Sequence, residues 1–355
     1  MPLRTVELTG TPLAMGRQYG EELREEARAM VGTRLELAAQ TAAELQPARD
    51  LQWCLDAAAD AVPVVEAYSP PVHQELQGIA EATGLSLPEL VIGNGWTDFR
   101  DLLKARGAGH NCTSIAAGAP LTADGHTLVA QTWDMNHSAA PYLVVVRRRP
   151  DDGPRTLSLT TSGCLSLIGM NEDGLAIGNT NLTPTDARPG VFYLALIHEA
   201  LRQRTLDRAV AAITDACRMS GHYYYLADAA DQFVGLETMA TRHAVMSLTD
   251  RRICHANHYL DQAQVASGMA TAPGASSLSR QERASELMAG LRGEATDTSL
   301  SQILSDHRGE NCICRHVQED TPWASLAAVV MEPATRQVWV WDGPPCEGDV
   351  QCFEP

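Results

Sequence analysis

The sequence predicts an α+β protein in which antiparallel sheets are covered by layers of helix. Helix-forming residues dominate the first third of the chain, short β-type runs begin at residue 113, and Asp-Gly pairs separate several of these runs. The chain has 355 residues, which is enough for one large domain or two modest ones. We expect one compact unit because no long linker rich in Gly, Ser or Pro interrupts it.

The N-terminal part is predicted to be mainly helical. Residues 20–45 contain no proline and place apolar residues at helical spacing among Ala, Leu, Glu and Arg. Residues 73–82 have a helical pattern after two prolines, and Ser86 begins a Ser-Leu-Pro-Glu sequence typical of a helix N-terminus. We expect this helical part to end near Lys104.

The remainder of the chain is predicted to be rich in strands. The Asp-Gly pairs at residues 124–125 and 173–174 indicate hairpins, because glycine reaches positive φ at low cost. The first four β-type runs are predicted to form a β-meander. Strands are expected at residues 113–118, 127–133, 142–149, 156–161, 222–227, 232–238, 244–248, 326–331 and 337–341, and helices at 191–203, 205–215, 280–291 and 300–306.

Composition excludes several classes of partner. The chain has 44 acidic and 27 basic residues and a net charge of −17, so nucleic acid and anionic membranes would repel it. No stretch approaches the roughly 20 apolar residues of a membrane span, and residues 1–20 lack the pattern of an export signal. The nine cysteines are an odd number, which is typical of reduced thiols. We therefore expect a cytoplasmic protein that binds neither nucleic acid nor membrane.

The candidate nucleophile is Cys112, at the junction of the helical and β-rich parts. A loop that contains glycine leads into this cysteine at the head of a predicted strand. If the chain were cut before Cys112, its thiol and a new α-amine would lie on the same residue. An α-amine has a pKa of about 8, so it can act as the base that activates the thiol. Alternatively, Cys112 is a small buried residue that starts a strand.

Several motifs occur in an order that resembles a known enzyme family. They are residues 16–20, residues 75–84, Cys112-Thr113-Ser114, residues 125–134 ending in Trp133-Asp134, Cys254-His-Ala-Asn-His258, Asp306-His307 and Ile313-Cys-Arg-His316. Their order and spacing resemble the acyl-coenzyme A:6-aminopenicillanic acid acyltransferase family, the isopenicillin-N acyltransferase-like peptidases. The matches extend over nearly the whole chain.

The resemblance implies an αββα four-layer N-terminal-nucleophile hydrolase sandwich, made as a precursor that cleaves itself. The cleaved bond here would be Asn111–Cys112, where the family usually has glycine in place of Asn111. The fragments 1–111 (helical, α chain) and 112–355 (β-rich, β chain) would stay associated as one compact domain. The implied activity is that of a cysteine amidohydrolase or acyltransferase, acting through an acyl-enzyme on a small amide or thioester, for example a natural-product intermediate.

The resemblance also implies a role for individual residues. Cys112 would attack the substrate carbonyl, and the Asp134 carboxylate would accept hydrogen bonds from the region of the freed amine or thiol. Asn257 would present its amide N–H to the developing oxyanion. The alternatives are that Asp134 caps a turn and that Asn257 is an ordinary loop amide.

Three further residues are expected near the substrate. Thr113 and Trp133 adjoin the predicted nucleophile and carboxylate in the sequence, and Arg315 would supply a cation near the substrate or transition state. For Arg315 the alternative is an ion pair that only stabilises the fold. We expect no cofactor.

Zinc binding is a competing chemistry. Cys312 and Cys314 are separated by one residue, whereas paired ligands of structural zinc sites are usually separated by two to four. On a strand their side chains would point the same way, which a buried core also requires. We therefore expect no metal and retain, as the alternative function, a non-catalytic or zinc-stabilised binding protein of the same fold. The histidines that could join such a site are His255, His258, His307 and His316.

Overall fold

The structure is a computed structural model that describes residues 3–103, 112–318 and 321–355. Its helices are α1 (Pro12–Glu22), α2 (Arg24–Ala43), α3 (Leu51–Ala59), α4 (Val62–Tyr68), α5 (Pro70–Thr83), α6 (Leu87–Asn94), α7 (Trp96–Leu102), η1 (His137–Tyr142, 3-10), α8 (Tyr193–Leu201), α9 (Leu206–Thr214), α10 (Gln262–Ala266), α11 (Ala275–Ala289) and α12 (Asp297–Leu304). Its strands are β1 (Thr5–Gly10), β2 (Thr113–Ala117), β3 (Leu128–Asn136), β4 (Leu143–Pro150), β5 (Thr156–Thr161), β6 (Ile168–Asn171), β7 (Ala176–Leu182), β8 (Gly221–Ala227), β9 (Phe233–Thr238), β10 (His243–Met246), β11 (Arg252–His255), β12 (Trp323–Glu332), β13 (Gln337–Asp342) and β14 (Val350–Phe353).

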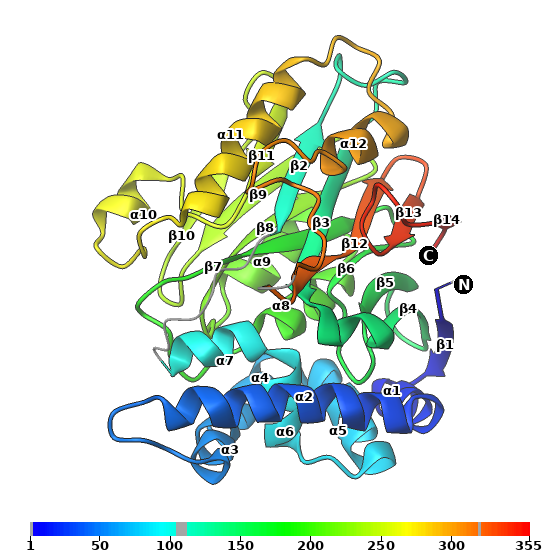
Figure 1. Cartoon of the computed structure of the whole chain (residues 1–355). Coiled ribbons are helices and arrows are strands. Elements are labelled where there is room, and N and C mark those ends of the chain that lie inside the picture. Colours follow the sequence, from blue (N-terminus) through cyan, green and yellow to red (C-terminus); the bar gives the residue numbers. More distant parts are fainter. Residues whose placement is uncertain (1–2, 104–111, 319–320) are drawn as a thin grey trace.

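The described elements form four layers, with two sheets between helices (Figure 1). Helices α1, α8 and α9 contact the eight-stranded sheet, and α5 and α6 contact α8. Helices α11 and α12 contact the six-stranded sheet. The sheets meet each other through β2 and β7, and through β12 and β6. The predicted α+β class and its αββα arrangement are confirmed.

The strand order shows one error of the sequence-based topology. The eight-stranded sheet has the order β1-β4-β5-β6-β7-β8-β9-β10, and the six-stranded sheet has the order β11-β2-β3-β12-β13-β14. The first four predicted strands therefore belong to two sheets, and the expected single meander is wrong. The physical reason is η1, which contains Pro141 and directs the chain from β3 in one sheet to β4 in the other. Strand β1 pairs with β4 in parallel, which the sequence pattern did not indicate.

Local signals predicted several element boundaries. Ser86 caps α6 and forms a reciprocal capping box with Glu89, as its sequence indicated. Gly125 and Gly174 have φ of +83° and +82°, and they lie between the antiparallel pairs β2–β3 and β6–β7. The helix expected over residues 20–45 is instead divided into α1 and α2 at Leu23, whose φ and ψ of −119° and 28° are not helical.

Alternating side chains of β3 divide the apolar interior. Val129 and Trp133 belong to the core that includes the helices of the N-terminal part and the inner faces of the sheets. Leu128 and Ala130 belong to a second core with Met288 of α11 and other residues of α11 and α12. This alternation, which has the two-residue period of a strand, places successive β3 side chains in different layers.

A buried ionic cluster connects the N-terminal helices to the eight-stranded sheet. Arg148 of β4 donates from Nε to Oε1 of Glu75 in α5 at 2.8 Å, and Nε2 of His198 in α8 lies 3.2 Å from Oε2 of Glu75. Although burial raises the pKa of Glu75, the charge of Arg148 and the interactions with Arg148 and His198 hold it at about 2. The carboxylate is therefore ionised at neutral pH and holds α5 against the sheet.

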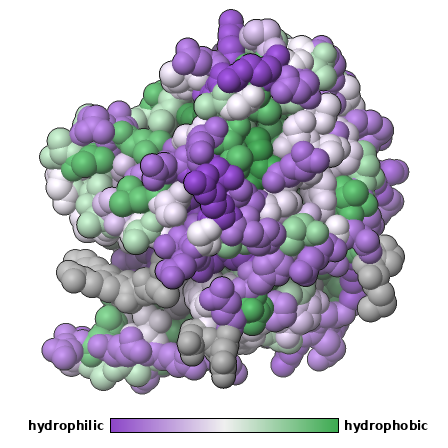
Figure 2. Space-filling view, turned by 45° about the horizontal axis from the view of Figure 1, so that its top comes forward, coloured by the Kyte–Doolittle hydropathy of each residue, from purple (hydrophilic) through white to green (hydrophobic). Residues whose placement is uncertain are grey.

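The surface shown in Figure 2 is mostly hydrophilic, and its hydrophobic side chains gather in separate patches. Among the residues that the structure describes, no helix combines the length and the apolar character needed to cross a lipid bilayer. Large hydrophobic side chains that are exposed include Val245, Val265, Leu278, Val317 and Val350.

Close contact between α1 and α5 depends on two glycines. A Cβ placed on Gly16 would lie 2.1 Å from the backbone oxygen of Glu75, and one placed on Gly78 would lie 2.3 Å from the backbone oxygen of Leu13. Backbone atoms cannot rotate away as a side chain can. Both glycines belong to the N-terminal motifs of residues 16–20 and 75–84, so these motifs have a packing role.

We expect Gly78→Ala to lower the free energy of unfolding by about 1–3 kcal/mol, because the added methyl group overlaps backbone atoms of α1. Urea unfolding followed by circular dichroism would measure this change. Gly32→Ala in α2 is the matched control, since its Cβ has nothing within 4 Å. Alanine there should be neutral or stabilise by up to about 1 kcal/mol. Equal effects of the two substitutions would contradict the inferred close packing.

Candidate functional site

Cys112 lies immediately before β2, with 6% of its surface exposed. Its Sγ lies 3.9 Å from the backbone oxygen of Asp134 on the neighbouring strand β3. The predicted cleavage residue Asn111 and the rest of the loop over residues 104–111 lie outside the described residues. This position is compatible both with a nucleophile and with an ordinary buried residue, so the surrounding groups must distinguish the two interpretations.

Arg280 of α11 donates hydrogen bonds to three of the residues at this site, and its own surface is 0% exposed. Its Nη1 donates to the backbone oxygen of Cys112 and, at 2.8 Å, to Oγ1 of Thr113. Its Nη2 donates to Oδ1 of Asn257 at 2.8 Å. Burial lowers the pKa of Arg280 to about 10 against the opposing charge of Asp134, so the guanidinium remains charged at neutral pH. Three of the residues expected at the site are thus hydrogen-bonded to one cation.

Asp134 lies within β3 and is buried. Its Oδ1 accepts a hydrogen bond from Oγ of Ser325 on β12 at 2.8 Å, while its Oδ2 is buried without a hydrogen-bond partner among the described residues. The alternative that Asp134 caps a turn is therefore wrong. Burial raises the pKa of Asp134 to about 6, although Arg280, Ser325 and Arg315 oppose this shift. The carboxyl can hold or release a proton near neutral pH, and Oδ2 can accept another hydrogen bond.

The thiol of Cys112 is a weak acid in this environment. Burial, with a smaller effect of the Asp134 carboxylate, raises its pKa to about 12. The thiolate is the nucleophilic form of cysteine, and at neutral pH almost none is present at such a pKa. Nucleophilic chemistry at Cys112 therefore requires a nearby base.

Asn257 follows β11 and is fixed by several hydrogen bonds. Its backbone N–H donates to Oγ of Ser277 at 2.8 Å, and its Nδ2 donates to the backbone oxygen of Asn181 at 3.0 Å. The bond to Asn181 uses one of the two hydrogens on Nδ2. Asn257 is thus a positioned amide with a second N–H to offer, held on the other side by Arg280.

Trp133 and Arg315 have different relations to this group. Trp133 is 5% exposed and packs in the large core on the face of β3 opposite to Asp134. Arg315 donates from Nη1 to Oγ of Ser276 at 3.1 Å, and its backbone N–H donates to Oγ of Ser325 at 3.0 Å. Ser325 also donates to Asp134, so the backbone of Arg315 is linked to Asp134 through this serine. The charge of Arg315 also lowers the pKa of Asp134.

Arg280, Asn181 and Ser325 were missed in the sequence. A signal for Arg280 exists, because it occupies the buried stripe of α11 with Ala284 and Met288, and an arginine in such a stripe requires a buried partner. Both side-chain polar atoms of Asn181 are buried and lack a partner within the described part of the chain. No sequence pattern distinguishes Asn181 or Ser325 from other polar strand residues.

The zinc candidates of the sequence divide into separate environments. Nε2 of His255 lies 2.8 Å from Oε1 of Glu237, and Nδ1 of His258 lies 2.8 Å from Oγ of Ser277. Sγ of Cys312 donates to the backbone oxygen of Cys314. The remaining candidates gather with a cysteine that the sequence did not indicate: His307, Cys314, His316 and Cys346.

Comparison with known proteins gives one family match. The family model described as acyl-coenzyme A:6-aminopenicillanic acid acyl-transferase matches residues 121–345. This range contains Asp134, Asn257, Arg280 and Arg315 and begins after Cys112.

Solved structures with weaker similarity include two bacterial enzymes. One is a mutant of conjugated bile acid hydrolase from Clostridium perfringens, with 12% identity, a TM-score of 0.48 and coverage of 69% of this chain and 97% of that chain. Another is penicillin V acylase from Agrobacterium tumefaciens, with 14% identity, a TM-score of 0.44 and coverage of 68% of this chain and 86% of that chain. Both scores lie below 0.5, so these similarities carry no weight for the chain's activity.

We expect Arg280→Met to lower the free energy of unfolding by about 3–5 kcal/mol, because it leaves Asp134 without its main compensating charge. The loss should depend on pH. The folded-state pKa of Asp134, about 6, lies above its usual value of 3.8, so the folded protein binds the proton more readily and stability falls as pH rises through 6. Removing Arg280 raises this pKa further, and the deficit should be larger at pH 8 than at pH 5.

Urea unfolding at the two pH values would measure the deficit. Arg292→Met is the matched control, because Arg292 is exposed beyond the end of α11 and its loss should change stability by no more than about 0.5 kcal/mol. A deficit of equal size at pH 5 and pH 8 would show that Arg280 does not compensate the Asp134 charge.

Proposed function

Because the chain belongs to the acyl-coenzyme A:6-aminopenicillanic acid acyl-transferase family, we propose that it is a self-processed cysteine amidohydrolase or acyltransferase. The coarse activity, acyl transfer or amide hydrolysis, follows from the family. The nucleophile, the self-cleavage and the small amide or thioester substrate belong to the proposal. The observation that carries it is the buried Arg280, which binds both Cys112 and Asn257 beside the Asp134 carboxyl.

Self-cleavage would supply the base that the buried thiol lacks. The sulfur of Cys112 would attack the carbonyl carbon of Asn111, its thiol proton would pass to the nitrogen of the Asn111–Cys112 bond, and the C–N bond would break to release that nitrogen as the α-amine. Water would then hydrolyse the resulting thioester, which releases the Asn111 carboxylic acid and regenerates the thiol. The new α-amine, with an ordinary pKa of about 8, can accept the proton of the thiol on the same residue.

Asp134 supports this scheme through its Oδ2, which is buried and has no hydrogen-bond partner in the described ranges. A buried carboxylate oxygen in that state is costly, and a protonated α-amine on Cys112 would supply both a donor and an opposite charge. The ionised carboxylate would then orient the amine. Its protonation near pH 6 would weaken that interaction on the acid side.

The oxyanion would be stabilised by amides. When thiolate attacks an acyl carbon, negative charge develops on the carbonyl oxygen, and preorganised N–H donors stabilise it. Asn257 is held by Arg280 and by Asn181 and has a second N–H on Nδ2 to offer. The side chain of Asn181, with both polar atoms buried and without a partner in the described part, is the neighbouring polar group that a substrate can contact.

The catalytic cycle would proceed through an acyl-enzyme. The tetrahedral intermediate would expel the amine or thiol of the substrate, which takes a proton from the α-ammonium, and a thioester on Cys112 would remain. Attack by water completes hydrolysis, and attack by an acceptor amine completes acyl transfer. Which of them reacts depends on acceptor binding and on how far water is excluded.

The two fragments would stay together because they share an apolar interior. The large core contains residues from both sides of the predicted cleavage point, including Val31 and Phe99 before it and Val145 and Leu196 after it. Separation would expose this core to water.

Intact mass and N-terminal sequencing of the purified wild-type protein test the proposal. We expect fragments of about 12 and 26 kDa by share of length, which elute together under native conditions, and a second N-terminus at Cys112. Cys112→Ala should give one chain of 38.3 kDa without turnover. Cys217→Ala, at an exposed cysteine, is the control and should be processed normally. A wild-type enzyme that turns over as an uncut chain would contradict the mechanism, and an uncut, inactive chain would favour the non-catalytic binding protein.

Asn257→Asp separates the two functions of that side chain. The aspartate retains an oxygen that can accept from Arg280 but has no N–H for the oxyanion, so we expect kcat to fall about 100–1000-fold. The assay is acyl release from any amide that the wild type hydrolyses. Asn136→Asp is the control, because aspartate also caps a helix start, and its kcat should be unchanged. A wild-type kcat in Asn257→Asp would exclude Asn257 from the oxyanion site.

A further inference from the structure

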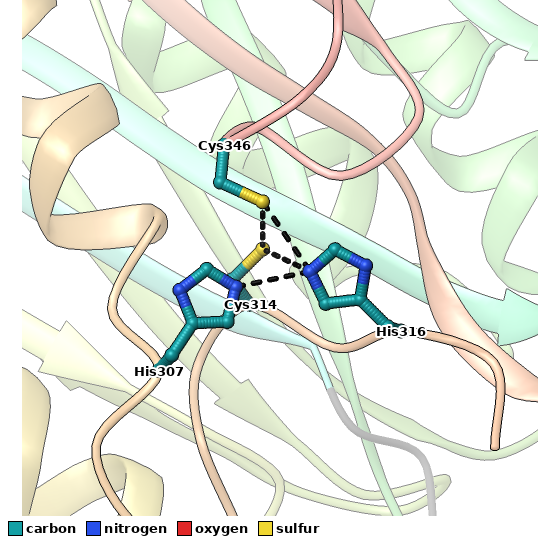
Figure 3. A group of neighbouring side chains, drawn as sticks. All are labelled: His307, Cys314, His316 and Cys346. Carbon is teal, nitrogen blue, oxygen red and sulfur yellow. Dashed lines mark hydrogen bonds between the residues drawn. The ribbon is translucent and has the colours of Figure 1, made fainter.

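Four metal-ligating side chains from separate segments converge on one point. His307 follows α12, Cys314 and His316 precede β12, and Cys346 lies between β13 and β14. Figure 3 shows that their side chains point toward one another. One potential ligand atom from each residue lies within 4.8 Å of those of the other three.

Four of the six separations between these atoms are close to the edges of a zinc tetrahedron. With Zn–N of about 2.0 Å and Zn–S of about 2.3 Å, tetrahedral geometry gives edges of about 3.3 Å for N–N, 3.5 Å for N–S and 3.8 Å for S–S. The observed distances are 3.0 Å between Nε2 of His307 and His316, 3.5 Å between the two sulfurs, and 3.3 and 3.9 Å from Nε2 of His316 to Cys346 and Cys314.

A carboxylate lies behind one of the histidines. Oε1 of Glu347 is 3.7 Å from Nδ1 of His316, the ring nitrogen opposite to the one that faces the other ligand atoms. A histidine that binds metal through Nε2 commonly directs its Nδ1–H to a carboxylate, which fixes the tautomer. Here the 3.7 Å separation is that of an ion pair and is too long for a hydrogen bond, and Glu347 is next in sequence to Cys346.

We propose that His307, Cys314, His316 and Cys346 bind one Zn²⁺ ion as a structural site. Two thiolates and two imidazoles in tetrahedral positions are the donor set typical of zinc. Four protein ligands leave no open position, so the ion would stabilise the fold and take no part in chemistry at Cys112. This differs from the sequence-based expectation of no metal, which considered Cys312 and Cys314 as the cysteine pair.

The ion would hold the segment that supports the candidate active site. Arg315 stands between two of the ligands, and its backbone N–H donates to Ser325, which donates to Asp134. The ligand His307 follows Asp306, whose carboxylate accepts from Arg283 of α11 at 2.7 Å. The metal ion would therefore stabilise the positions of Ser325, which binds Asp134, and of Asp306, which binds α11 through Arg283.

A disulfide between Cys314 and Cys346 is the competing arrangement. Their sulfur atoms are 3.5 Å apart, whereas a disulfide bond is about 2.05 Å long. Such a bond would need an oxidant, and it would remove both thiolates from the ligand set. The test must therefore count thiols as well as metal.

The experiment uses the full chain, purified under reducing conditions without a histidine tag, loaded with ZnSO₄ and passed through gel filtration. Elemental analysis should find close to one zinc per chain, and Cys346→Ser should lose at least nine-tenths of it. Cys352→Ser is the matched control at another exposed cysteine of the C-terminal segment and should retain the full amount. Cobalt(II) in place of zinc should give the visible absorption of a tetrahedral thiolate site in the wild type and in Cys352→Ser.

Thermal unfolding supplies a second readout. EDTA should lower the midpoint of the wild type and of Cys352→Ser, and it should leave that of Cys346→Ser unchanged. A reduced wild-type chain that binds no zinc, or equal zinc in all three proteins, would overturn the proposal. Two missing thiols in unreduced, metal-free protein that does not take up zinc after reduction would assign Cys314 and Cys346 to a disulfide instead.

Discussion

The candidate site depends on one buried guanidinium. Arg280 has no exposed surface, so the cost of removing its charge from water must be offset by the groups that surround it. These groups are the backbone oxygen of Cys112, Oγ1 of Thr113, Oδ1 of Asn257 and the charge of Asp134. Each of them is buried or partly buried and would lose a stabilising partner without Arg280. The interaction is therefore mutual, and loss of any member affects the others.

The register of the six-stranded sheet explains why these groups meet. Thr113 pairs with Thr132 in the antiparallel pair β2–β3, and this pairing places Cys112 next to the part of β3 that contains Asp134. Ser325 pairs with Asp134 from the other side. Helix α11 packs on the outer face of the same sheet and supplies the guanidinium. Residues distant in sequence become neighbours because strand pairing fixes their positions along adjacent strands. The packing of α11 determines that the Arg280 guanidinium approaches from the outer face of the sheet.

Sequence patterns predicted what depends on neighbouring residues. The capping box at Ser86, the Asp-Gly turns and the helices that follow β7 are predicted by residues that lie within a few positions of one another. The parallel pairing of β1 with β4 and the division of the expected meander between two sheets are not, because both depend on which distant strands meet. The same limit applies to the site. Cys112, Asp134 and Asn257 belong to motifs with recognisable neighbours, whereas Arg280, Asn181 and Cys346 acquire their roles through contacts that a single sequence does not record.

The candidate active site and the proposed metal site meet at a β-bulge. The register of β12 against β3 shifts between Ser325 and Ala327, and such shifts redirect side chains. Ser325 donates its backbone N–H to the oxygen of Arg315, and its Oγ accepts from the N–H of Arg315, each at 3.0 Å, so the ligand-bearing segment and β12 hold each other. The hydroxyl of Ser325 then donates to Asp134 and lowers the pKa of that carboxyl. A displacement of the segment between Cys314 and His316 would weaken this donated bond and favour the neutral acid, because burial already raises its pKa. Ordering of the ligand-bearing segment by the proposed metal site would in this way be coupled to the ionisation of Asp134, through the two hydrogen bonds between Arg315 and Ser325 and the hydroxyl of that serine.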